Sequence, residues 1–242
     1  MTGASSGIGA ALSEALAAAG AKVALAARRT DRTNALAEKI RAGGGEALPV
    51  RLDVTSAESI RRAFDEIEAA FGPPTVVVNS AGVGEAKTFL KTPRELLDRT
   101  MGTNFFGVWD VCQEAAGRMV AAKTGGSIIN VASILGLGAA VGYSSYSASK
   151  GALIQLTRTL ALEFVKHGIR VNALAPGWFV SEMNQEFFAS EAGQAYAKRI
   201  APGRTGEMPE LVGPLLLLAS DAGSYVNGAV LPVDGGQHAA LG

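Results

Sequence analysis

Tyr146 and Lys150 are the two residues whose types and spacing most directly indicate chemistry. They are four positions apart, so in a helix they would share one face. A free tyrosine has a pKa of about 10 and is a poor base at neutral pH. A nearby ammonium would stabilise the phenolate, and lowering the pKa by about 2 to 3 units requires roughly 3 to 4 kcal/mol. Such a pair could pass a proton to or from a substrate oxygen, whereas on a solvated helix face it would have no such role.

A second pattern lies at the start of the chain, which reads MTGASSGIG and has glycines at positions 3, 7 and 9. Glycines permit a tight turn and let the backbone approach a pyrophosphate closely. The helix that follows would offer free N–H groups and a partial positive charge to phosphates. An ordinary tight loop has the same composition, so the pattern gains meaning only from the elements that follow it.

Short apolar strands alternate with helices along the rest of the chain. Continuous apolar strands separated by helices indicate a parallel sheet covered on both faces. The sequence therefore predicts an α/β fold, one doubly wound domain over residues 1–242. We expect strands within 22–27, 46–54, 75–82, 125–133, 169–177 and 228–236, and helices at 7–19, 28–42, 56–71, 103–122 and 147–166. A last helix within 209–221 contains Pro214 and should be kinked or start late.

Ligands of a doubly wound sheet bind at the carboxyl ends of its strands. Polar or turn-forming residues follow five of the predicted strands, which is the arrangement expected for a binding crevice. These residues are Arg28 and Arg29, Asp53, the segment 79–82, Ser133, and Pro176 with Gly177.

The composition argues against several classes of function. The chain has 22 basic and 22 acidic residues, which gives no electrostatic footprint for nucleic acid or an acidic membrane. Cys112 is the only cysteine, so we expect no intrachain disulfide, no metal and a reducing, cytoplasmic compartment. The apolar run 15–27 is too short to span a bilayer, and the first residues do not resemble a signal peptide.

Eight segments together resemble the short-chain dehydrogenase/reductase family along essentially the whole chain. They are TGASSGIG, LDV, NSAG, MGTN, INVAS, YSASK, APG and VDGG, in the order and spacing of that family. The chain is similar to its 3-oxoacyl-(acyl-carrier-protein) reductases and its sugar or polyol dehydrogenases. The resemblance implies a Rossmann-type sheet and hydride transfer between a nicotinamide cofactor and a carbonyl group or secondary alcohol.

The resemblance also implies roles for single residues. Tyr146 would be the general acid/base, Lys150 would lower its pKa and bind the nicotinamide ribose, and Ser133 would hydrogen-bond the substrate carbonyl. Asn104 would hold a water that links Lys150 to solvent, unless it only caps or kinks its helix. The cofactor would contact Gly3, Ser5, Ser6, Gly7, Ile8, Gly9, Arg28, Arg29, Asp53, Val54, Asn79, Ala81, Gly82, Tyr146, Lys150, Pro176, Gly177, Phe179 and Ser181.

The residues after the second family strand bear on the choice between NADP and NAD. In the family, an acidic residue at the end of this strand binds the ribose 2′-hydroxyl of NAD. This chain has Ala27 there, followed by Arg28 and Arg29. A guanidinium suits a 2′-phosphate by charge and geometry, so we expect NADP, with NAD as the alternative. Arg28 is nearer the strand and is the stronger ligand, unless both arginines are only solvated residues at a helix start.

One element of the family pattern does not precede the glycine turn. In the family a central strand of about six residues lies before the TG pair, whereas here only Met1 precedes Thr2. The true start could lie upstream, the chain could have been clipped or renumbered, or the strand could be truly absent. The intact motifs favour the first two explanations.

Two segments are expected to border the substrate, the uncharged loop 134–143 and a lid at 178–203. The lid aromatics Trp178, Phe187, Phe188 and Tyr196 favour a neutral, partly apolar ketone or secondary alcohol. Glu182 and Glu186 are alternative contacts for a polyol.

The resemblance implies a homotetramer or homodimer, with helices around 104–122 and 150–166 across an interface. Helices buried within one chain have the same composition, so this remains open. A nicotinamide-binding sensor or scaffold without turnover is the alternative function, suggested by the missing strand. A different enzyme class on the same fold, such as a methyltransferase, would have no use for Ser133, Tyr146 and Lys150.

Overall fold

The structure, a computed structural model, describes residues 1–182 and 184–239. Within these residues, strands and helices alternate along the chain as the sequence predicted. The strands are β1 (Lys22–Ala27), β2 (Glu46–Arg51), β3 (Val76–Asn79), β4 (Gly126–Val131), β5 (Ile169–Pro176) and β6 (Val230–Val233). The α-helices are α1 (Gly7–Ala18), α2 (Thr30–Ala42), α3 (Ala57–Phe71), α4 (Arg94–Met101), α5 (Gly107–Ala122), α6 (Ser144–Phe164), α7 (Gln185–Ala189), α8 (Glu191–Ala197) and α9 (Val212–Ala219).

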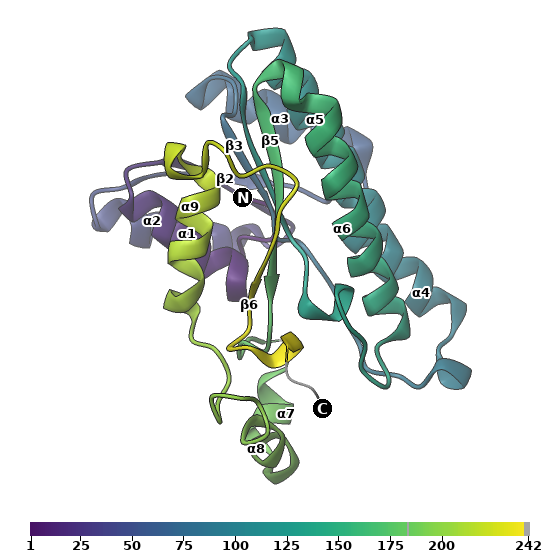
Figure 1. The fold of residues 1–242 in the computed structure, drawn as a ribbon. Helices are drawn as coiled ribbons and strands as arrows, with labels where there is room; N and C mark the ends of the chain where they lie inside the picture. Colours follow the sequence, from purple (N-terminus) through teal and green to yellow (C-terminus); the bar gives the residue numbers. More distant parts are fainter. Residues whose placement is uncertain (183, 240–242) are drawn as a thin grey trace.

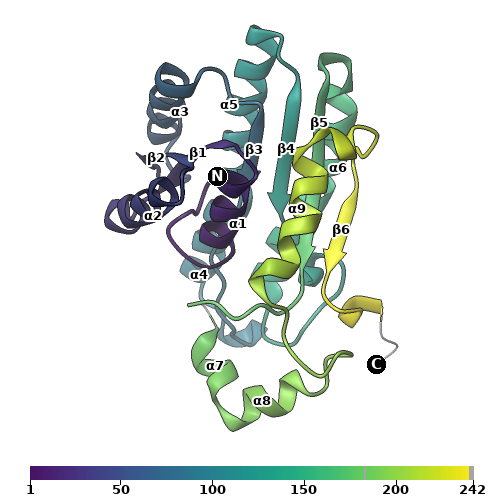
Figure 2. The same cartoon turned by 90° about the vertical axis from the view of Figure 1, so that its left-hand side faces the viewer.

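All pairs of neighbouring strands are parallel, as expected for a Rossmann-type sheet. Strand β1 pairs with β2, and the other four strands follow in the order β3-β4-β5-β6. Figure 2 shows the strands side by side, with the N-terminus between β1 and β3.

The first residues of the chain join the two parts of the sheet. Thr2 forms parallel bridges with Ala26 of β1 and with Asn79 of β3. The Thr2 N–H donates to the carbonyl oxygen of Val78 (3.0 Å), and the Ala26 N–H donates to that of Met1 (2.9 Å). Met1 and Thr2 therefore lie where the family resemblance places the carboxyl end of the central strand, and they fix the glycine turn between β1 and β3.

Helices cover both faces of the sheet. Helices α1, α2 and α9 lie on one face, and α3, α5 and α6 lie on the other (Figures 1 and 2). One core cluster includes Leu12, Leu25 and Leu215, and the second includes Val111 and Ile128. Almost every residue of β4 and β5 is buried, which is why these strands read as continuous apolar runs.

Local sequence explains where several helices begin. The side chain of Ser56 caps α3 by accepting a hydrogen bond from the N–H of Ser59 (3.2 Å). Pro214 is the third residue of α9, where a missing N–H is tolerated, so this helix starts late as expected. The helix expected at 103–122 begins only at Gly107, because a π-helical turn over Gly102–Phe106 continues from α4. The sequence did not predict α4.

The carboxyl ends of the strands point toward the end of the molecule that carries α7 and α8 (Figure 1). These two short helices belong to the connection between β5 and α9, where a lid was expected at 178–203. In the described ranges, no helix has both the length and the apolar character needed to cross a membrane.

Candidate active site

A cavity of about 1160 Å³ lies at the carboxyl ends of the strands. Strands β1 to β5 all contribute wall residues at or just beyond their ends, which is where ligands bind in doubly wound sheets. These residues are Arg28 and Arg29, Asp53 and Val54, 80–86, 132–135 and 176–179.

The glycine turn forms one wall of the cavity and leaves no room for a side chain at Gly3 or Gly9. Gly3 and Gly7 have positive φ values of 67° and 55°. A Cβ on Gly3 would lie 2.8 Å from the Ala81 backbone, and one on Gly9 would lie 2.3 Å from the carbonyl oxygen of Gly3. Helix α1 begins directly after Ser6, whose side chain makes no capping hydrogen bond. The first N–H groups of α1 are therefore available to a phosphate.

Tyr146 and Lys150 face this cavity from the first turns of α6. The Lys150 Nζ lies over the Tyr146 ring, 5.6 Å from its centroid, and donates to the carbonyl oxygen of Val131 (2.8 Å). Ser133 follows β4 and borders the cavity, with its Oγ accepting from the N–H of Leu135 (3.1 Å). Helix spacing and a strand end thus bring together the three side chains predicted from the sequence.

The pKa values of this pair differ from the expectation. Burial raises the pKa of Tyr146 to about 12, and the Ser133 side chain acts in the opposite direction. Burial lowers the pKa of Lys150 to about 8. The expected lowering of the phenol pKa by Lys150 is not met in this structure, because desolvation penalises the charged form of both groups. At neutral pH Tyr146 therefore carries its proton.

Asn104 does not belong to the cavity wall. It is fully buried, its Oδ1 accepts from the Val83 N–H (2.8 Å), and its Nδ2 donates to the Val83 carbonyl (2.8 Å) and the Ser149 hydroxyl (3.1 Å). A Cβ on Gly82 would lie 3.5 Å from Asn104 Oδ1 and 3.7 Å from Lys150 Nζ. Both the oxygen and the nitrogen of the Asn104 amide are therefore hydrogen-bonded within the protein. The side chain holds the backbone of Val83, which lines the cavity.

Asn79 was expected near the cofactor ribose, but its side chain points into the core and is 1% exposed. Its Nδ2 donates to Asn130 Oδ1 (2.9 Å) and to Cys112 Sγ (3.3 Å), and Asn130 donates in turn to Thr157 of α6 (2.9 Å). Successive strand residues face opposite sides, so the sequence motif alone did not fix this direction. Ser80, the next residue, borders the cavity instead.

Arg29 makes the contacts at the end of β1, although the sequence favoured Arg28. The Arg29 Nε and Nη2 donate to Ser5 Oγ (3.2 and 3.0 Å), and Nη2 also donates to Ser6 Oγ (2.6 Å). Its Nη1 donates to a carboxylate oxygen of Glu182 (3.1 Å). Arg28 borders the cavity and makes no ion pair among the described residues.

Asp53 follows β2 and presents a charged carboxylate to the cavity. Its Oδ1 accepts from the backbone N–H (3.0 Å) and hydroxyl (2.7 Å) of Thr55, and these bonds lower the pKa of Asp53. A carboxylate held in this way is an acceptor for polar ligand groups at neutral pH.

Aromatic side chains form another part of the wall. Tyr143, Trp178, Phe187 and Tyr196 border the cavity, and the Trp178 ring lies edge-on to Tyr143 and Tyr196 with centroid distances of 5.9 Å. The Trp178 Nε1 and Gln237 Nε2 both donate to the Tyr196 hydroxyl (3.1 and 3.2 Å). The uncharged loop expected beside the substrate adds Ile134, Leu135, Ala140 and Val141.

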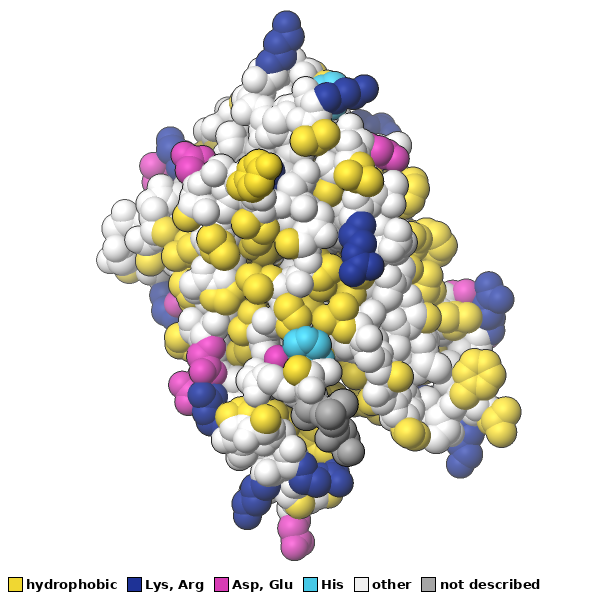
Figure 3. Space-filling view, viewed as in Figure 1, with side chains coloured by type: hydrophobic (Ala, Val, Ile, Leu, Met, Phe, Trp, Pro, Cys, Tyr) yellow, Lys and Arg dark blue, Asp and Glu magenta, His cyan; other side chains and the backbone are white. Residues whose placement is uncertain are grey.

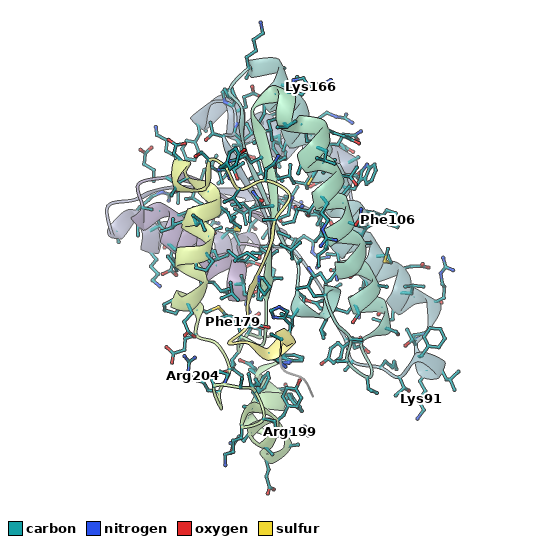
Figure 4. The ribbon with its side chains drawn as sticks, viewed as in Figure 1. Lys91, Phe106, Lys166, Phe179, Arg199 and Arg204 are labelled. Atoms are coloured by element: carbon teal, nitrogen blue, oxygen red, sulfur yellow. The ribbon has the colours of Figure 1, made fainter. Side chains whose placement is uncertain are left out.

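The segment after β5 is held against the start of α1. Phe179, labelled in Figure 4, is buried and packs so closely on Gly206 that a Cβ there would lie 2.5 Å from its ring. A Cβ on Gly7 would lie 3.3 Å from the Cβ of Ser181. The Asn184 side chain accepts from the Ser181 N–H (2.8 Å) and donates to the Phe179 carbonyl (2.9 Å). No sequence motif identifies Asn184, because a side-chain bridge of this kind has no characteristic residue pattern.

A family model described as enoyl-(acyl carrier protein) reductase matches residues 3–238. The chain belongs to the short-chain dehydrogenase/reductase family. L-rhamnose 1-dehydrogenase (NAD(P)(+)) of Azotobacter vinelandii is 39% identical over 98% of this chain and 94% of that protein. A 3-oxoacyl-(acyl-carrier-protein) reductase of Mus musculus is 36% identical over 97% and 94%. A gluconate 5-dehydrogenase from Burkholderia cenocepacia, crystallised with NADP and tartrate, has a TM-score of 0.95 at 35% identity, covering 99% and 94%.

This short-chain dehydrogenase/reductase is thus an oxidoreductase of a family whose named members act on alcohol and carbonyl groups. All the residues expected to contact the cofactor line the cavity, apart from Asn79. The sequence did not predict several residues of the cavity wall. Those in the loop after β3 could have been predicted, because the whole loop follows the end of a strand. Among the missed residues are Leu52, Val83, Gly84, Glu85, Ala86, Thr103, Val131 and Asn184.

Proposed function

We propose that this enzyme uses NADP to interconvert a neutral carbonyl compound and its secondary alcohol. The observation that carries the proposal is that Ser133, Tyr146 and Lys150 share one cavity with a glycine turn and two arginines. The relative crystallised with NADP supports this cofactor. NAD is the alternative, since the name of the rhamnose dehydrogenase covers both cofactors.

The residues present fit such a dinucleotide. The close approach at Gly3 and Gly9, together with the free N–H groups of α1, would hold a pyrophosphate. Arg29 would bind the 2′-phosphate with Ser5 beside it, and Asp53 would accept hydrogen bonds from the adenosine part. When bound, the nicotinamide supplies or accepts the hydride.

The proton is handled by this chain's own residues. In the direction of reduction, the neutral phenol of Tyr146 donates its proton to the substrate oxygen, and Ser133 donates a hydrogen bond to the same oxygen. The ammonium of Lys150, protonated below its pKa of about 8, stabilises the phenolate that remains. In the direction of oxidation, Tyr146 must first lose its proton. Asn104 would act as a positioning residue that fixes the backbone of Val83 beside this group.

A neutral substrate is favoured by the charges around the cavity. In the described part of the chain, the lysines and arginines of the wall are Arg28, Arg29 and Lys150, all assigned to the cofactor or the proton transfer. A substrate carboxylate would therefore find no cation among the aromatic wall residues. Aromatic faces suit the CH groups of a sugar, a polyol or an apolar ketone.

The test is the Tyr146→Phe variant, with Tyr143→Phe as the matched control on the same wall. We expect Tyr146→Phe to lose turnover by about a thousandfold or more, because the proton donor is removed, with an NADP dissociation constant within about twofold of the wild type. Neutral sugars, polyols and ketones should be turned over in preference to sugar acids. Full activity of Tyr146→Phe on a good substrate would exclude the assignment.

The same experiment separates the alternatives. A nicotinamide-binding sensor would bind NADP and turn over none of the substrates, and the Tyr146 variant would then change nothing measurable. A methyltransferase would bind neither dinucleotide. The neutral phenol beside a buried ammonium favours the oxidoreductase, because desolvating both groups serves a proton transfer and gives no advantage to a protein that only binds the cofactor.

The segment 178–203 would act as a lid of the single domain 1–242, and its aromatic residues would cover the substrate. The enzyme would assemble as a homotetramer or homodimer through α5 and α6. Two exposed aromatic side chains support this: Trp109 (47% exposed) borders an apolar groove of about 740 Å³ between these helices, and Phe106 (58% exposed) lies three residues before it. A single cysteine, Cys112, favours the cytoplasm as the compartment.

A further inference from the structure

Glu182 connects the proposed lid to the site proposed for the cofactor phosphate. One of its carboxylate oxygens accepts from Arg29 Nη1 (3.1 Å), and the other accepts from Arg32 Nη1. Both arginines belong to the start of α2, about 150 residues earlier in the chain. Within residues 1–182 and 184–239, Glu182 makes all the ion pairs between the segment 178–203 and the rest of the chain.

Arg29 therefore has two sets of partners. Its guanidinium donates to the carboxylate of Glu182 through Nη1 and to the hydroxyls of Ser5 and Ser6 through Nε and Nη2. A phosphate monoester at this place would carry a charge of about −1.5 to −2, whereas Glu182 carries −1. A phosphate would also accept hydrogen bonds from both serine hydroxyls, which a carboxylate seated on Nη1 does not.

Release of Glu182 from Arg29 would affect the glycine turn, because the segment that carries Glu182 packs against this turn. Glu182 directly follows Ser181, whose Cβ lies 3.3 Å from the position of a Cβ on Gly7. Glu182 itself borders the cavity together with Arg28 and Arg29. The Arg29 guanidinium, which follows β1, thus contacts both the glycine turn and the lid segment.

We propose that Glu182 is a specificity-determining residue that competes with the 2′-phosphate of the cofactor for Arg29. An arriving 2′-phosphate takes Arg29, leaves Glu182 on Arg32 alone and loosens the lid. A dinucleotide with a 2′-hydroxyl leaves both ion pairs intact. Glu182 therefore lowers the preference for NADP over NAD and couples the identity of the cofactor to the lid. This inference rests on the proposed binding of a nicotinamide dinucleotide.

The test measures dissociation constants for NADP, NAD, 2′,5′-ADP and 5′-AMP with the wild type, Glu182→Gln and Glu186→Gln. Glu186 is the matched control, because it is an exposed carboxylate on the same segment with no ion pair among the described residues. We expect Glu182→Gln to bind NADP and 2′,5′-ADP about two- to fivefold more tightly, with NAD and 5′-AMP unchanged. Tryptic cleavage after Lys198 and Arg199 should be faster in Glu182→Gln and, in the wild type, faster with 2′,5′-ADP than with 5′-AMP.

Weaker NADP binding by Glu182→Gln, or an equal change for both cofactors, would overturn the competition. An equal effect of Glu186→Gln and Glu182→Gln would also overturn it, because the effect would then come from the overall charge of the lid and not from the ion pair with Arg29. These outcomes leave the proposed function standing, since the wild type still binds a dinucleotide. If the wild type binds neither NADP nor NAD, the proposed function and this inference both fall.

Discussion

At the scale of single residues, burial decides the chemistry of the site more than the distance between charges. Lys150 is 4% exposed, and its one hydrogen bond goes to the carbonyl oxygen of Val131. Desolvation lowers its pKa from 10.5 to about 8, while Tyr146 moves in the opposite direction. In the proposed mechanism Lys150 serves proton transfer, and its burial as a charged group lowers the free energy of unfolding.

Replacing Lys150 with methionine should therefore stabilise the protein at neutral pH. At pH 7 the buried ammonium costs up to about 3 kcal/mol, the free energy equivalent of its lowered pKa, and Lys150→Met removes that cost. Because the folded-state pKa is lowered, the unfolded chain binds more protons between pH 8 and 10.5. The wild type should therefore gain stability relative to the variant as the pH rises through this range.

Urea denaturation at pH 7 and pH 9.5 measures both effects. Lys166→Met is the matched control, because Lys166 is exposed at the far end of the molecule (Figure 4) and should change stability by less than about 0.5 kcal/mol. A Lys150→Met variant that is less stable than the wild type at pH 7 would show that the hydrogen bond to Val131 outweighs desolvation.

At the scale of elements, the glycine turn and α1 form a unit that works only through close backbone approach. A Cβ on Gly9 would lie 2.3 Å from the carbonyl oxygen of Gly3, and backbone atoms cannot yield as a flexible side chain can. This unit is positioned by Thr2, whose N–H and hydroxyl are bonded to β3 and to the residues after it.

Gly9→Ala should distort the turn and weaken NADP binding at least tenfold, with a loss of stability of about 1 to 3 kcal/mol from overpacking. Gly213→Ala is the control, because Gly213 lies in α9 with no atom within 4 Å of an added Cβ. The control should leave binding unchanged and change stability by less than about 1 kcal/mol, because the helix propensity of alanine is offset by the proline ring of Pro214, which disfavours a helical non-glycine residue before it. Titration of dinucleotide fluorescence and urea denaturation measure these quantities, and unchanged binding by Gly9→Ala would contradict the role of the turn.

At the scale of the whole molecule, one edge of the surface exposes hydrophobic side chains. Figure 3 shows hydrophobic side chains along the edge where α6 lies, and Figure 4 places Phe106 on this edge. Trp109 borders the groove between α5 and α6, together with Leu160 and Phe164. A second copy of this chain would bury this surface, which supports the proposed assembly.

Trp109→Glu should weaken this association by at least about thirtyfold, because it places a charge in the centre of an apolar contact. Light scattering after size exclusion should find the wild type as a tetramer or dimer and the variant as a smaller species. Leu90→Glu is the control, since Leu90 is 96% exposed away from the groove. A monomeric wild type, or a variant of unchanged size, would contradict the interface.

The sequence by itself determined the features that depend on local spacing. Alternating apolar strands and helices predicted the doubly wound sheet, glycines 3, 7 and 9 predicted a tight turn before a helix, and positions 146 and 150 had to share a helix face. These predictions hold because each is set by backbone geometry over a few residues.

Only the tertiary structure decided which side chains meet across the sheet. Asn79 points into the core, Arg29 takes the serines of the glycine turn, and Glu182 reaches Arg29 from a segment 153 positions away. Packing also set the pKa of Tyr146 above its ordinary value, against the expectation from the nearby lysine. These outcomes depend on burial and on contacts between distant segments, which no local pattern of residues encodes.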